Sequence, residues 1–121
     1  MNYAEVFGRL VFETAIVIFM KKDGTIRTML ATRNLQTVAL VYGFQGNVLG
    51  GHDNRCNIGN GNVAVFDMIA GDARSFNIDR LISIEYFGEL KTREEYDEAL
   101  KKFVDFKNKY ESKMITMDMI E

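Results

Sequence analysis

The chain has 121 residues, of which 47% are hydrophobic and 26% are charged, and its formal net charge is −2. This length and composition are typical of one globular domain, which we expect to span residues 1–121. Without a global positive charge, nucleic acid would have to bind at a local basic patch. The single Cys56 excludes an internal disulfide, and no cleavable leader or membrane-spanning run is evident, so we expect a cytoplasmic protein without membrane contact.

The segment over residues 2–13 is predicted to form a short amphipathic helix. Its apolar side chains recur at the spacing of one helix face, at Val6, Phe7, Leu10 and Val11. The alternative is a first strand, because Gly8 disfavours a helix and the valine, phenylalanine and tyrosine side chains also suit strands.

Two strand-like runs follow, over residues 14–22 and 25–33, and Asp23-Gly24 joins them. Asp-Gly between such runs predicts a β-hairpin with a type I′ turn, in which both central residues take positive φ. Side chains alternate between the faces of a strand, so Arg27 and Arg33 are expected on the same face.

Residues 34–62 differ in character from the strands on either side. A further strand is conceivable over residues 36–44, but glycine and asparagine dominate from Gly43 onward. We therefore expect an insert over about residues 43–62, either a long hairpin excursion or a mobile loop. Loops of this length inside a compact domain are usually functional or disordered.

Residues 63–87 predict a second hairpin followed by a corner. A strand over residues 63–68 leads through the turn Ala70-Gly71-Asp72 into a return strand. The alternation of apolar side chains then changes phase at residues 79–81, which indicates a bend in a small curled sheet. The two phases are marked by Phe76 and Ile78 before the bend, and by Ile82, Ile84 and Tyr86 after it.

The sequence Thr92-Arg93-Glu94-Glu95 has the pattern of a capping box at the start of a helix. We expect this helix over about residues 93–113, docked on the sheet or on a partner. Its apolar stripe consists of Tyr96, Ala99, Leu100, Phe103, Phe106 and Tyr110. Residues 114–121 are expected to add an edge strand or to fray. The predicted fold is mainly β, a barrel of about five strands over about residues 14–90 with a C-terminal helix and a short N-terminal helix.

Three stretches together resemble a known family. Lys22-Asp23-Gly24, the following IRTMLATRN, and VFDMIAGDARSFNIDRLISIEYF over residues 65–87 are similar to small phage proteins with a WYL-like, Sm-like or SH3-type barrel. This resemblance implies a strongly bent barrel that acts in an infected bacterial cell. Relatives of WYL domains are modules that sense ligands or nucleic acid, and the implied binding residues include Arg74 and the pair Asp79-Arg80.

The residue types of metal and catalytic sites gather only at His52, Asp53 and Cys56. One histidine and one cysteine are too few for a usual structural zinc site, and no third group is positioned to orient a Cys-His dyad. The glycines of the insert lack the spacing and the strand-to-helix context of a phosphate loop. We therefore expect no metal, no cofactor and no enzymatic activity.

Basic and aromatic side chains are the remaining candidates for a binding site. Arginines on the hairpins and the insert would form a charge-segregated surface, because many of the acidic residues lie in the C-terminal helix, and neighbouring aromatic rings would stack on bases. The candidates are Arg27, Arg33, Tyr42, Phe44, Arg55, Arg74 and Arg80. The alternative is that Arg74 and Arg80 brace the barrel by pairing with Asp79, Asp72 or Glu85.

The first functional hypothesis is a non-enzymatic phage accessory protein, such as a host-takeover or anti-defence inhibitor, whose insert contacts a host or phage macromolecule. Two alternatives stay open. One is a barrel that binds single-stranded nucleic acid, and the other is a sensor or sponge for a nucleotide or small anionic ligand. Free strand edges and the tail over residues 114–121 also favour a homo-oligomer.

Overall fold

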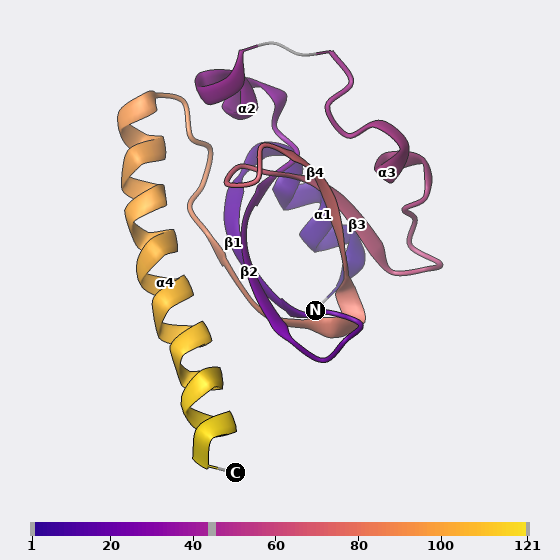
Figure 1. The fold of residues 1–121 in the computed structure, drawn as a ribbon. Helices are drawn as coiled ribbons and strands as arrows, with labels where there is room; N and C mark the ends of the chain where they lie inside the picture. The colour runs from indigo at the N-terminus through magenta and orange to yellow at the C-terminus, as the bar shows by residue number, and fades with distance from the viewer. Residues whose placement is uncertain (1, 44–45, 121) are drawn as a thin grey trace.

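The fold is described by a computed structural model, which covers residues 2–43 and 46–120 (Figure 1). In chain order the elements are α1 (Tyr3–Phe12), β1 (Thr14–Met20), β2 (Ile26–Thr32), α2 (Leu35–Tyr42), α3 (Gly50–Asn54), β3 (Asn62–Asp67), β4 (Asp72–Asn77), the 3-10 helix η1 (Ile78–Arg80), β5 (Leu81–Tyr86) and α4 (Arg93–Ile120).

The strands form one antiparallel sheet in the order β4-β3-β2-β1-β5. Its two outermost strands, β4 and β5, are joined only by the three residues of η1. Such a short connection brings the two ends of the sheet together, so the sheet curls into the ring seen in Figure 1. The predicted mainly β barrel with a helix at each end is confirmed, and its corner lies at residues 78–80.

Each face of the curled sheet has its own apolar core. The inner core combines α1 with one face of the strands, including Val6, Leu10, Val17, Met29, Val65 and Phe76. The outer core packs α4 and α2 against the other face, including Ile16, Ile18, Leu30, Val38, Phe66 and Phe103. The helix predicted for residues 2–13 is therefore correct, and α4 docks on the sheet through its expected stripe.

The β1–β2 hairpin is confirmed, but the predicted type I′ turn is wrong. The Lys21 N–H donates to the Thr25 carbonyl at 2.8 Å, and the Gly24 N–H donates to the Lys21 carbonyl at 3.0 Å. Gly24 alone in this turn has positive φ, at 87°. The Asp23 carboxylate accepts from the N–H and the hydroxyl of Thr25, which holds a three-residue turn with a left-handed glycine at its end.

The strand considered for residues 36–44 is wrong over its described part, because residues 35–42 form helix α2. The Asn34 side chain caps this helix by accepting from the Gln36 N–H at 3.0 Å. The Thr37 hydroxyl then anchors it by donating to the Leu90 carbonyl at 3.0 Å. The described part of the insert that follows contains α3 and the buried Leu49, so it is neither a hairpin excursion nor an irregular loop throughout.

The predicted capping box forms at the start of α4. The Glu95 N–H donates to the Thr92 hydroxyl at 3.2 Å, and the Thr92 N–H donates to the Glu95 carboxylate at 3.1 Å. The expected edge strand at residues 114–121 is wrong over its described part, since α4 continues to Ile120. No glycine or proline follows Gly88 in the sequence, so no residue type that breaks helices stops α4 earlier.

Candidate functional site

A basic cleft lies between the tip of the β1–β2 hairpin and the corner formed by β4 and η1. Its volume is about 340 Å³, and none of its lining residues is acidic. Its basic side chains are Lys21, Lys22, Arg27, Arg74 and Arg80. Phe19, Met29 and Phe76 also line it and belong to the inner core, so an apolar base underlies a cationic rim.

The corner of the barrel positions this cleft. The Phe19 and Phe76 rings lie 5.9 Å apart and hold the hairpin against the end of β4. Asn77 caps η1 by accepting from the Asp79 N–H at 2.9 Å. Its amide also donates to the Asn60 carbonyl at 3.0 Å, which ties the end of the insert to the same corner. Local capping and aromatic packing therefore present Arg80 beside the hairpin tip.

Three cations of the cleft have acidic partners that lie outside its lining. Arg27 pairs with Asp67 at 3.1 Å, Arg74 pairs with Asp72 at 3.0 Å, and Lys21 lies 3.9 Å from Asp23. The Arg74 hydrogen bond holds the pKa of the Asp72 carboxyl below its ordinary value, so the partner stays ionised at neutral pH.

The exposed Lys22 and Arg80 have no ion-pair partner among residues 2–43 and 46–120. The predicted bracing of the barrel thus has a counterpart for Arg74, through Asp72. In the described part of the chain it has none for Arg80. Two full positive charges are consequently available to a ligand at the rim.

The cleft brings together Arg27, Arg74 and Arg80 out of the predicted candidates, and the two other arginines lie elsewhere. Arg33 is only 11% exposed, where it donates to the Ala64 carbonyl at 2.6 Å and to Asp53 at 3.0 Å. Arg55 donates to the Gly51 carbonyl at 3.1 Å. The bond from Arg33 to Asp53 ties the insert to the barrel, whereas the bond from Arg55 lies within the insert.

Of the two predicted stacking rings, Tyr42 does not line the cleft. The Tyr42 hydroxyl donates to the Met68 carbonyl at 2.6 Å, and its ring packs edge-on against Phe66 with centroids 5.4 Å apart. Tyr42 therefore belongs to the outer core. Phe44 lies outside the described residues.

Lys21 and Lys22 were absent from the predicted set, although the sequence contains a signal for them. Both precede the Asp-Gly turn, so they occupy the hairpin tip, where side chains project beyond the sheet. The curled sheet brings these lysines together with Arg74 and Arg80. The sequence does not reveal this, because the two pairs lie far apart in the chain.

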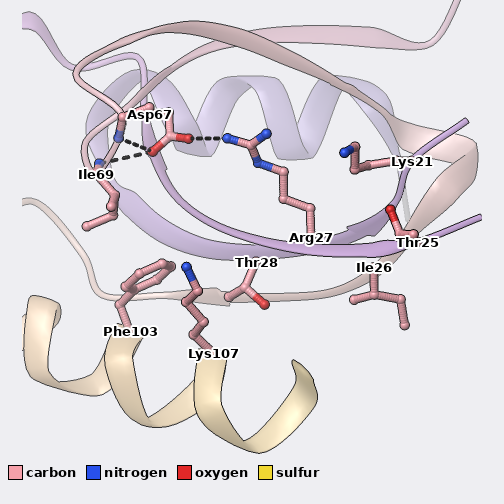
Figure 2. A pocket seen from close by; sticks show the side chains of 10 residues that line it. Lys21, Thr25, Ile26, Arg27, Thr28, Asp67, Ile69, Phe103 and Lys107 are labelled. Atoms are coloured by element: carbon pink, nitrogen blue, oxygen red, sulfur yellow. Dashed lines mark hydrogen bonds and ion pairs between the residues drawn. The ribbon is translucent and has the colours of Figure 1, made fainter. Parts of the chain in front are cut away.

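A second hollow of about 340 Å³ adjoins the cleft and shares Lys21 and Arg27 with it. Figure 2 shows the residues that line this hollow on both sides of β2, with Arg27 reaching Asp67 on one side and Lys107 of α4 on the other. We call it the edge pocket. Within the described residues, no three His, Cys, Asp or Glu side chains are grouped so as to hold a metal ion.

A small curled barrel with a helix at each end defines the class of Sm-like and SH3-like barrels, and the cationic cleft at its corner is compatible with binding. The family model described as WYL_2, Sm-like SH3 beta-barrel fold, matches residues 9–82, and the chain belongs to this family. No curated protein and no solved structure matches the chain. Among the described residues, no helix is long and apolar enough to cross a membrane.

Proposed function

We propose that the protein binds single-stranded nucleic acid through the basic cleft. The observation that carries this proposal is the convergence of five cations from separate segments on a cleft with no acidic lining residue. The chain as a whole has a net charge of −2, so this concentration of positive charge is local. A local cationic surface attracts phosphates even when the overall field of the protein does not.

The size of the cleft favours a single strand over a duplex. Its volume of about 340 Å³ is at the lower end of the range for small-molecule sites. It therefore accommodates about one nucleotide unit rather than the width of a double helix. Phosphates would lie at the rim near Lys22 and Arg80, while the apolar side chains beneath favour a base or sugar.

The proposal describes a binding protein without a catalytic step. A role as a phage accessory protein in an infected bacterial cell is part of the proposal, and it is supported by the resemblance of the hairpin sequences to small phage proteins. A free nucleotide would use the same cations, so competition by mononucleotides distinguishes a sensor or sponge from a protein that binds polymers.

The test is fluorescence anisotropy of a short labelled single-stranded oligonucleotide, with Arg80→Gln and Arg93→Gln compared. Arg93 is a matched control, because it is exposed at the start of α4 and lies outside the lining of the cleft. Arg80→Gln is expected to weaken binding about tenfold, since a charge-assisted hydrogen bond is lost, while Arg93→Gln leaves affinity unchanged. Absence of binding at low salt, or equal losses in both variants, would contradict the proposal.

A second candidate function is capture of a protein partner through the insert. Ile58 is 71% exposed on the loop between α3 and β3. The side chains of Asn57 and Asn60 each accept the backbone N–H of the other residue, at 2.9 and 3.2 Å, which fixes the loop that displays it. A rigid exposed apolar side chain is a suitable anchor for a partner.

Deletion of the whole insert is a poor test of this candidate, because the insert supplies Leu49 to the core and Asp53 to Arg33. Ile58→Asp leaves those contacts intact. If the insert captures a host protein, a pull-down from bacterial lysate treated with nuclease loses that protein in the Ile58→Asp variant. Retention of the same protein would exclude Ile58 as its anchor.

A further inference from the structure

Half of strand β2 has a free edge. Strand β3 pairs with β2 only at Ala31 and Thr32, and the Met68 N–H then donates to the Leu30 carbonyl at 2.8 Å. Strand β3 ends at Asp67, and the chain then turns back into β4 at Asp72. No strand in the described part of the chain pairs with residues 26–29 on that side.

The direction of the backbone groups along β2 follows from its bonds. The Leu30 carbonyl faces the β3 side, whereas the Thr25 carbonyl accepts from Lys21 on the β1 side. Backbone groups alternate along a strand, so the N–H groups of Ile26 and Thr28 point to the free edge. Unpaired N–H groups at a sheet edge are donors for an anion.

The edge pocket lies directly against these groups. Four consecutive residues of the hairpin line it, from Thr25 to Thr28, although successive side chains of a strand point to opposite faces. A hollow that touches all of them therefore runs along the edge of the strand. Figure 2 shows Arg27 and Thr28 leaving β2 on opposite sides, with Phe103 and Lys107 of α4 closing the pocket below.

Charge in the edge pocket is positive on both sides of the strand. Lys21, Arg27 and Lys107 face a single carboxylate, Asp67, which is 4% exposed. The oxygens of Asp67 already accept from the Ile69 and Ala70 N–H groups, at 3.0 and 3.1 Å, and from Arg27. Asp67 thus orients Arg27, and the negative charge of Asp67 is balanced within the protein. Lys107 has no ion-pair partner within the described part of the chain, whereas Lys21 lies 3.9 Å from the exposed Asp23, which is outside the pocket lining.

A further polar group at this place lacks a partner. The hydroxyl of Thr28 is buried and, within the described residues, makes no hydrogen bond. Buried hydroxyl groups in proteins are usually bonded. A ligand oxygen in the edge pocket would supply the missing acceptor after a rotation about the Thr28 Cα–Cβ bond.

We infer that the edge pocket binds a phosphate group. The backbone N–H groups of Ile26 and Thr28 and the side chains of Lys21, Arg27 and Lys107 are its donors. Lys107 lies beyond residues 9–82, the segment matched by the family model, so this site includes a residue outside that segment. The phosphate belongs either to a free small molecule or to a nucleic acid whose neighbouring nucleotide occupies the basic cleft.

The edge pocket and the basic cleft can be tested separately, because Lys107 lines only the former and Arg80 only the latter. Binding of inorganic phosphate is measured by calorimetric titration at constant ionic strength. Lys107→Gln is expected to weaken it about tenfold, the usual loss for one hydrogen bond from a charged donor. Lys109→Gln is the matched control, since Lys109 is exposed on the same helix and lies outside the pocket lining.

The inference stands if Lys107→Gln weakens phosphate binding while Lys109→Gln and Arg80→Gln do not. Equal losses for Lys107→Gln and Lys109→Gln, or no phosphate binding by the native chain, would overturn it. If phosphate binds in a manner that depends on Lys107 while oligonucleotides do not bind, the proposed function fails and the inference survives. If oligonucleotides bind and phosphate does not, the inference fails alone.

The source of the phosphate follows from a pair of oligonucleotides that differ only at the 5′ end. Tighter binding of the 5′-phosphorylated form, lost in Lys107→Gln, assigns the pocket to a terminal phosphate of nucleic acid. Equal binding of the two forms that Lys107→Gln weakens assigns it to an internal phosphate of the strand. Equal binding of the two forms that Lys107→Gln leaves unchanged, together with binding of inorganic phosphate that depends on Lys107, assigns it to a free phosphate compound.

Discussion

The two ends of strand β2 present the same residue type with different consequences. At the hairpin end, Arg27 borders both the basic cleft and the edge pocket and has one ion-pair partner, Asp67. Just beyond the other end, Arg33 stacks on Phe7 at 4.1 Å and bonds Ala64 and Asp53. An arginine surrounded by protein partners stabilises the fold, whereas one beside a hollow is available to a ligand.

The largest expected effect is on stability, at Arg33. Arg33→Gln leaves the Ala64 carbonyl without its donor and removes the stacking on Phe7, so the free energy of unfolding should fall by about 2–3 kcal/mol. The bond to Asp53 adds little, because that carboxylate is half-exposed. Urea denaturation measures the loss. Oligonucleotide affinity of the folded variant should be unchanged. A weaker affinity with unchanged stability would show that Arg33 serves binding and not the stability of the fold.

Arg27 should show both kinds of effect. Arg27→Gln leaves the buried Asp67 carboxylate without its ion-pair partner, which is expected to destabilise the protein by about 1–2 kcal/mol. It also removes a cation from both hollows, so the affinities for oligonucleotide and for inorganic phosphate should fall together. The paired measurements are urea denaturation and the two binding titrations. A fall in only one affinity would show that Arg27 serves only one of the hollows.

The smallest expected effect concerns the pH dependence of stability at Glu13. The hydrogen bond from Arg9, 2.7 Å long, holds the pKa of Glu13 below its ordinary value of 4.5. A lowered pKa in the folded state contributes stability above the ordinary value, and that contribution disappears as pH falls through the lowered pKa. Urea denaturation over a pH series should show Glu13→Gln less stable than the native chain at neutral pH, with the difference vanishing in acid. A stability difference that stays constant with pH would show that the lowered pKa of Glu13 is not its cause.

Much of the fold could be predicted because its signals are local. The Thr92–Glu95 capping box and the Asp23-Gly24 hairpin each depend on a few adjacent residues. Helix α2 was missed because Thr37, Val38 and Val41 also suit strands, and the contacts that decide the matter are tertiary, such as the bond from Thr37 to Leu90.

The candidate site was predictable only in part, because tertiary contacts again decide the outcome. Arg74 and Arg80 could be proposed from the sequence, but their approach to Lys21 and Lys22 depends on the curl of the whole sheet. The structural role of Arg33 depends on its bonds to Ala64 and Asp53, which lie in later segments of the chain. Strand alternation predicts that Arg27 and Arg33 point to the same face. It does not predict which residues surround each of them.

The most direct test of the proposed function is the salt dependence of oligonucleotide binding. Each phosphate neutralised on a single strand contributes about 0.7 to the slope of log affinity against log salt concentration. The double variant Lys22→Gln, Arg80→Gln removes the two unpaired cations of the cleft and should reduce that slope by about 1.4, twice the contribution of one contact. A slope equal to that of the native chain would contradict binding of nucleic acid in the basic cleft.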